Sequence, residues 1–301
     1  MARFIFWSDL HCDCEPFEIP VPAGQTGALP GAPEADEIDA ILVAGDIDTK
    51  GKHLDWLGAI WEIWRRPVLA VAGNHEPYGA KRFQKHLAQE LERLGELRAH
   101  GVDVDVMRKA VRVIGDTRII GATLWTDMNL YPEMAGYAHI SIKDAMNDYR
   151  HVKWFDAKPG IYRKMIPADT LAMHREEFSF IMDELAKPFG GRTIVMTHHL
   201  PVIQALNERR QASRSVISGA YASDLWPQIG NMKLDAWIHG HSHDAQEVCL
   251  EGAQGPVAIL SNIRGYPWEK TRYEPLRVLD SNAPLLGSSI EPGEAAATPE
   301  P

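Results

Sequence analysis

Residues 237–244, WIHGHSHD, place three imidazoles at alternate positions around one glycine: His239, His241 and His243. Neutral imidazole is the commonest protein ligand for zinc, iron and related metals, so this cluster indicates a metal site. We expect His239 to be a hydrogen-bonded histidine at the end of a strand and not a ligand. Gly240 marks the point where we expect the strand to end and the backbone to turn.

Four other segments carry side chains of the same types. They are Asp9 and His11, Asp46, Asn74 and His75, and His198 and His199. Each of the five segments follows a short apolar run, namely RFIFW, AILVA, VLAVA, TIVM and LDAWI in chain order. Such runs, closed by glycine or polar residues, predict buried strands. Because ligands of open α/β sheets bind beyond the carboxyl ends of strands, the five segments predict one shared site.

Helical patterns separate these strands. Apolar residues recur at helical spacing over residues 54–64, over 83–94, and over 171–185 after an expected N-cap at Asp169. The alternation of strands and helices predicts an α/β fold. Residues 104–125 instead predict successive strands joined at a turn, Gly115–Asp116, which makes the sheet arrangement mixed. PVAIL, before residue 261, predicts one more strand.

The composition of the chain bears on its possible partners and its location in the cell. The net charge of -10 over 301 residues argues against a polymeric nucleic acid as the partner, although bound cations would still allow a small anionic substrate. Three cysteines fit a reducing compartment. No segment reaches the roughly 18 apolar residues of a membrane span, so we expect a cytoplasmic protein. We expect one domain over residues 1–281, a surface excursion over 15–37, and a disordered tail over 282–301.

The ordered set of polar segments resembles the calcineurin-like metallophosphoesterase superfamily. Its five motifs stand here as Asp9-Leu10-His11, Gly45-Asp46, Gly73-Asn74-His75-Glu76, Thr197-His198 and Gly240-His241-Ser242-His243. The resemblance spans residues 9–243 and implies two packed mixed β-sheets flanked by helices, which agrees with the strands and helices expected above.

The resemblance also implies a ligand set. Asp9, His11 and His243 would hold one metal ion. Asn74, His198 and His241 would hold the second, and Asp46 would bridge the two, because one carboxylate can offer an oxygen to each of two cations. This mixed nitrogen and oxygen shell suits two divalent or trivalent transition metals, Mn, Fe or Zn.

The implied reaction is hydrolysis of a phosphate mono- or diester by metal-activated hydroxide, with His75 as general acid. In the family's phosphoprotein phosphatases, a second Asp three residues after the bridging Asp orients that histidine, and an Arg follows. Here Thr49 occupies that position, without the Arg. The departure argues against a phosphoprotein substrate and favours a small or nucleotide-like phosphodiester.

Four further residues are candidate substrate contacts. His199 adjoins a predicted ligand, Arg264 lies in SNIRGYPWE, and Tyr149 and Arg150 lie in MNDYR. For His199 the alternative is a side chain that binds nothing. For MNDYR the alternative is a loop tied down by its own Asn and Asp hydrogen bonds, and for Arg264 it is a surface salt bridge.

Two other functions remain open at this point. One is a non-catalytic scaffold of the same fold that uses the metal site to bind a partner protein, and the other is a nuclease. The complete ligand set together with His75 favours an enzyme over the scaffold, and the absence of a basic run disfavours the nuclease. The oligomeric state is left open.

Overall fold

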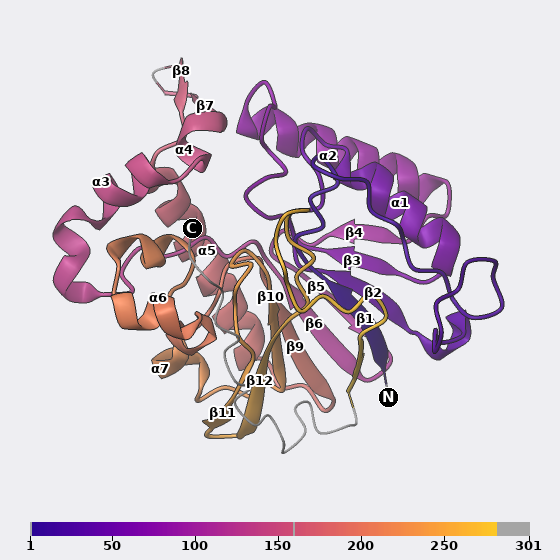
Figure 1. Ribbon diagram of the computed structural model, residues 1–301. Coiled ribbons are helices and arrows are strands. Elements are labelled where there is room, and N and C mark those ends of the chain that lie inside the picture. Colours follow the sequence, from indigo (N-terminus) through magenta and orange to yellow (C-terminus); the bar gives the residue numbers. More distant parts are fainter. Residues whose placement is uncertain (1, 159, 282–301) are drawn as a thin grey trace.

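The structure is a computed structural model that describes residues 2–158 and 160–281 (Figure 1). The tail expected to be disordered, residues 282–301, lies outside the described residues. Within these ranges two large β-sheets pack face to face, and helices cover their outer faces. The predicted mixed α/β architecture is confirmed.

The first sheet has the order β13-β1-β2-β3-β4. Its strands are β13 (Val278–Asp280), β1 (Arg3–Trp7), β2 (Ala40–Val43), β3 (Val68–Ala70) and β4 (Val104–Val106). Only β13 pairs antiparallel with its neighbour. The second sheet has the order β11-β12-β10-β9-β6-β5. Its strands are β11 (Val248–Gly252), β12 (Gly255–Ser261), β10 (Ala236–His239), β9 (Arg192–Met196), β6 (Thr117–Gly121) and β5 (Ala110–Ile114). All the strands predicted from apolar runs are present.

Both faces of the central strands are buried, which explains their continuous apolar sequences. Along β1, Phe4 and Phe6 pack between the two sheets, while Ile5 and Trp7 face the opposite way. That outer face is covered by α1 (His53–Trp64) and α2 (Phe83–Ala99). The outer face of the second sheet packs against α5 (Pro167–Ala186), whose Ile181 is fully buried there.

The chain between β6 and β9 forms an insertion beside the sheets (Figure 1). It contains α3 (Ala135–Ala145), α4 (Asp148–His151), the hairpin of β7 (Lys153–Asp156) with β8 (Ile161–Lys164), and then α5. Two short helices, α6 (Glu208–Ser213) and α7 (Trp226–Ile229), follow β9. Short 3-10 helices cover Ala35–Glu37, Pro132–Met134, Ile203–Ala205 and Val216–Ala220.

The three predicted helices are present, with one correction. Asp169 is not the N-cap of α5, because that helix begins at Pro167 and the Asp169 carboxylate accepts from the Ile166 backbone N–H at 2.9 Å inside the first turn. The predicted turn at residues 115 and 116 joins β5 to β6. β4, expected in the same run, pairs instead in the first sheet. None of the helices in the described ranges has both the length and the apolarity that a membrane span requires.

Candidate metal centre

The predicted metal-binding residues meet where parallel strands of both sheets end. Asp9 follows β1, Asp46 follows β2 and Asn74 follows β3, while His198 follows β9 and His241 follows β10. An isolated bridge between Ser8 and Ile263 ties the two sheets together at this edge. The position agrees with the rule that open α/β sheets bind ligands beyond the carboxyl ends of their strands.

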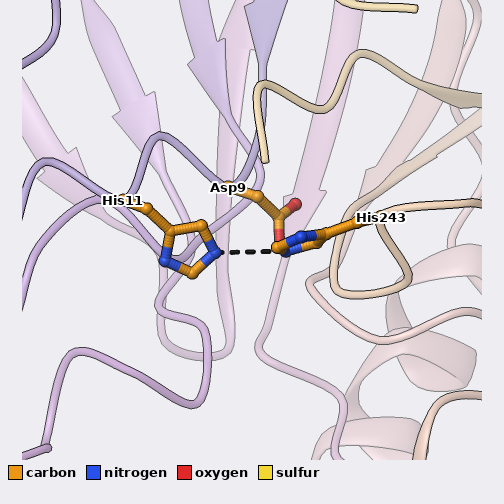
Figure 2. A group of neighbouring side chains, drawn as sticks. All are labelled: Asp9, His11 and His243. Atoms are coloured by element: carbon orange, nitrogen blue, oxygen red, sulfur yellow. Dashed lines mark hydrogen bonds and ion pairs between the residues drawn. The ribbon is translucent and has the colours of Figure 1, made fainter. Parts of the chain in front are cut away.

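Asp9, His11 and His243 form what we term the first ligand group. Figure 2 shows the two imidazoles pointing toward one another beside the carboxylate. His11 Nε2 and His243 Nε2 lie 3.1 Å apart, and His243 Nε2 lies 3.2 Å from Asp9 Oδ1. One proton can serve only one of these contacts at a time, whereas a cation can accept the lone pairs of both rings and the carboxylate together.

Asp46, Asn74, His198 and His241 form the second ligand group. His198 Nε2 lies 3.0 Å from Asn74 Oδ1 and 3.4 Å from Asp46 Oδ2. His198 Nδ1 donates to the Ala44 carbonyl at 2.8 Å, which fixes the tautomer and leaves Nε2 facing the group. The buried Nε2 of His241 has no hydrogen-bond partner among the described residues.

The Asp46 carboxylate lies between the two groups. One set of mutually close ligand atoms joins it to His198 and His241, and another joins it to His11 and His75. Asp46 is 2 % exposed, and its Oδ1 accepts from the His75 backbone N–H at 2.9 Å. A carboxylate in this position can offer oxygens to cations on both sides.

Close backbone packing makes this convergence possible. A Cβ on Gly73 would come within 2.1 Å of Asp46 Oδ1, and a Cβ on Gly240 within 2.4 Å of Asp9 Oδ2. The strand ends before Gly240 as expected, and the glycine is needed there for space. The left-handed conformation falls on His241, with φ 68°, and also on Asp9 and Asp46, each with φ 52°. Such strain is concentrated at functional sites.

The electrostatics of the histidines differ. Burial lowers the pKa of His11 to about 4 and the pKa of His241 well below its usual range, so both rings are neutral and keep a free lone pair. For His198, burial is outweighed by the Asp46 carboxylate, which raises the pKa to about 10. For His243, burial is outweighed by Asp9, which raises the pKa to about 9. Metal binding at these two rings therefore displaces protons.

The donor set fits transition metal ions. Imidazoles, two buried carboxylates and an amide oxygen converge from opposite sides, and neither His241 Nε2 nor His11 Nδ1 has a hydrogen-bond partner among the described residues. Imidazole suits Zn, Fe and related ions, whereas an all-oxygen shell would suit Ca or Mg. His239 belongs to none of the three candidate ligand groups found among the described residues. It is fully buried, and its Nδ1 lies 3.2 Å from the Gly240 carbonyl.

The His75 side chain lies next to both ligand groups, and we assign it to neither. Its side chain is 19 % exposed, and Nε2 lies 3.9 Å from Asp46 Oδ2 and 3.5 Å from Tyr266 Oη. The ring stacks on Tyr78 with centroids 4.4 Å apart. Tyr78 and Tyr266 therefore both contact the His75 ring.

Several residues at this site were not predicted from the sequence. Tyr266 stacks on His11 with centroids 4.2 Å apart, and Glu269 Oε2 lies 2.5 Å from His243 Nδ1. Asp148, on α4, lies in MNDYR, a segment considered above for substrate contacts, but its contact as acceptor from the Asn74 amide was not predicted. Tyr266 and Glu269 lie in SNIRGYPWE, but there the residue type drew attention to Arg264 alone.

A cavity of about 440 Å³ opens over the metal-binding residues. Its walls include His75 and Asp46 at the base, Arg210 on α6, Lys270 in the C-terminal segment and Asn147 before α4. The guanidinium of Arg210 stacks over the Tyr221 ring at 4.1 Å, and its Nε lies 3.4 Å from the Asp244 carboxylate, which also lines the cavity. Two cationic side chains therefore stand at the wall of a cavity whose base carries metal-ligand chemistry.

The four predicted substrate contacts do not line this cavity. His199 is 2 % exposed and packs against the His241 ring, and Tyr149 is 6 % exposed with its hydroxyl 3.1 Å from Thr170 Oγ1. Arg150 is exposed and donates to the Asp144 carbonyl. Arg264 donates to the carbonyls of Leu10, Glu15 and Pro16 and to the Glu15 carboxylate, so its guanidinium is already used within the fold.

Comparison with known proteins gives one family match. The profile described as Calcineurin-like phosphoesterase matches residues 2–245. Among solved structures, a phosphopantetheinyl hydrolase from Mycobacterium tuberculosis is 17 % identical with a TM-score of 0.57, covering 88 % of this chain and 90 % of that one. A dimetal phosphatase from Danio rerio is 14 % identical with a TM-score of 0.39, covering 86 % and 87 %. No curated protein matches the chain. The first of the two structures supports the fold.

Proposed function

We propose that this chain, which belongs to the calcineurin-like phosphoesterase family, is a dinuclear metal-dependent hydrolase of a small phosphate ester. The observation that carries the proposal is the Asp46 carboxylate between the two ligand groups, at the base of the cavity. When bound, two transition metal ions such as Mn, Fe or Zn supply Lewis acidity at the phosphoryl oxygens and a nucleophile at neutral pH.

The protein itself contributes binding and proton transfer. Lys270 and Arg210 line the cavity and attract the phosphoryl group and any second anionic part of the ester. His75 lines the same cavity and donates a proton to the leaving oxygen as general acid. Its ring is held by the stack on Tyr78 and by the contact with Tyr266 Oη. Thr49 offers no carboxylate that could orient the ring.

The cavity favours a small or nucleotide-like phosphodiester over a phosphoprotein. A volume of about 440 Å³ is at the lower end of the range for small-molecule sites. The net charge of -10 adds no long-range attraction for polyanions. The protein is expected to work as a cytoplasmic enzyme without a polymeric nucleic acid partner.

The test is a side-by-side assay of the purified full chain on a chromogenic phosphate monoester and a chromogenic diester, with Mn, Fe or Zn supplied. We expect metal-dependent turnover, faster on the diester. Absence of turnover on both, together with far fewer than two bound metal ions per chain, would remove the proposal. Full metal loading without turnover would instead favour a metal-site scaffold that binds a partner protein.

A further inference from the structure

We propose that Asp148 is a positioning residue that sets the orientation of the Asn74 amide, so that the amide oxygen and not the nitrogen faces the second ligand group. The inference rests on the proposed function, because it concerns a ligand of the second metal ion. It assigns a role to the insertion between β6 and β9, which supplies Asp148 from α4.

The contacts around Asn74 are asymmetric. Asn74 Nδ2 donates to Asp148 Oδ1 at 2.8 Å, and Asn74 Oδ1 lies 3.0 Å from His198 Nε2 on the opposite side. Tyr78 Oη donates to the same Asp148 oxygen at 2.5 Å. Asn74 and Asp148 are each 3 % exposed, so no bulk water competes for these groups.

An acceptor at this position selects one of two amide rotamers. The oxygen and nitrogen of Asn are nearly equal in size, so packing alone does not distinguish them, and hydrogen bonding must. Turning the amide over would put the Asn74 oxygen against the Asp148 oxygen and an N–H₂ group, which has no lone pair for a metal, into the second ligand group. The two buried oxygens would then face each other without a hydrogen bond between them, which disfavours the turned amide.

The same carboxylate also holds Tyr78, whose ring stacks on His75. Asp148 therefore contacts both the amide that faces the second ligand group and the support of the proposed acid. The contact with Asn74 spans 74 positions of the sequence, which is why the local segment MNDYR does not predict it.

The experiment is calorimetric titration of the metal-free full chain with Mn²⁺ alone. Wild type should bind two equivalents. Asp148→Leu keeps a similar volume but offers no acceptor, so it should weaken the second equivalent about 10–100-fold while the first stays unchanged. Asp148→Asn keeps one oxygen for both donors and should restore binding to near the wild-type level.

Tyr149→Phe is the matched control, because it removes a buried hydroxyl contact from the same helix without touching Asn74. It should bind both equivalents as wild type does. Wild-type binding of both equivalents by Asp148→Leu would overturn the inference while leaving the proposed function intact, and so would equal losses in Asp148→Leu and Tyr149→Phe. Failure of wild type itself to bind two equivalents would overturn both.

If Asp148→Leu does not fold, exchanging the side chains at positions 74 and 148 tests the inference instead. Asn74→Asp alone places two carboxylates together and should weaken the second equivalent. Adding Asp148→Asn returns a donor to that contact and should recover it. No recovery in the double variant would overturn the inference.

Discussion

His243 Nδ1 lies 2.5 Å from Glu269 Oε2, and this contact turns His243 Nε2 toward Asp9 and His11. Glu269 also accepts from the Tyr266 backbone N–H at 2.8 Å, so the turn that presents the carboxylate is itself fixed. Glu269 and Tyr266 lie beyond residues 2–245, the part of the chain that the family profile matches. The first ligand group is therefore supported by a segment outside the residues that the family profile matches.

Glu269→Ala should weaken the metal ion held by the first ligand group. Carboxylates that hold a ligating histidine typically contribute 10–100-fold to metal affinity, because they fix the ring and raise its basicity. After dialysis against buffered Mn²⁺, the metal content should fall from two ions per chain toward one. Glu269→Gln keeps an oxygen but not the charge, so its metal content should lie between those of wild type and Glu269→Ala. Full occupancy in Glu269→Ala under limiting metal would contradict this role.

His75→Ala should separate acid catalysis from metal binding. His75 faces the cavity, and loss of a general acid typically costs about 10²–10⁴-fold in rate. Turnover should fall by that order while the metal content, measured by elemental analysis, stays at the wild-type value. If the metal is lost as well, His75 acts as a ligand and the assignment of the acid is wrong.

Glu177 on α5 should make stability depend on pH. Burial raises its pKa to about 7, against the opposing effects of Arg108 and of the Trp125 backbone N–H. The folded state therefore holds the proton more tightly than the unfolded chain does, and this contribution to stability is present in acid and lost as pH rises from about 4.5 through about 7. Glu177→Gln keeps the acceptor oxygen and removes the ionisation.

Glu177→Gln should have a higher free energy of unfolding than wild type, and this difference should be larger at pH 8 than at pH 5. Because Glu177 is partly exposed, we expect a difference on the order of 1 kcal/mol, measured by urea unfolding. Glu176→Gln is the control, since the neighbouring carboxylate is 68 % exposed and pairs with Lys109 on the surface. An equal gain at both pH values would show that Glu177 does not titrate in this range.

The sequence predicts which residues converge at this edge because each follows directly on a buried strand. Apolar runs ending in Asp9, Asp46 and His198 are local signals, and parallel strands bring their carboxyl ends to one edge without further information. The same reasoning separates His239 from His241, since the strand ends between them.

The surroundings of the ligands could not be predicted in this way. Tyr266 reaches His11 across the whole chain, and Asp148 reaches Asn74 from an insertion, so neither contact leaves a local spacing pattern. For Arg264 the alternative of a surface salt bridge agrees with the structure, because its guanidinium pairs with Glu15 and donates to carbonyl groups of the 10–16 segment. Such contacts depend on how loops fold over the sheets, and periodicity does not encode that.

The proposed function requires two metal ions that share the Asp46 carboxylate. It is tested most directly by the metal content of wild type and Asp46→Asn after loading with Mn²⁺ and gel filtration. The amide keeps the shape and the acceptor for the His75 backbone N–H but cannot offer an anionic oxygen to each of two cations. We expect two ions per chain in wild type and at most one in Asp46→Asn. One ion or none in wild type, or two retained in the variant, would contradict the shared site.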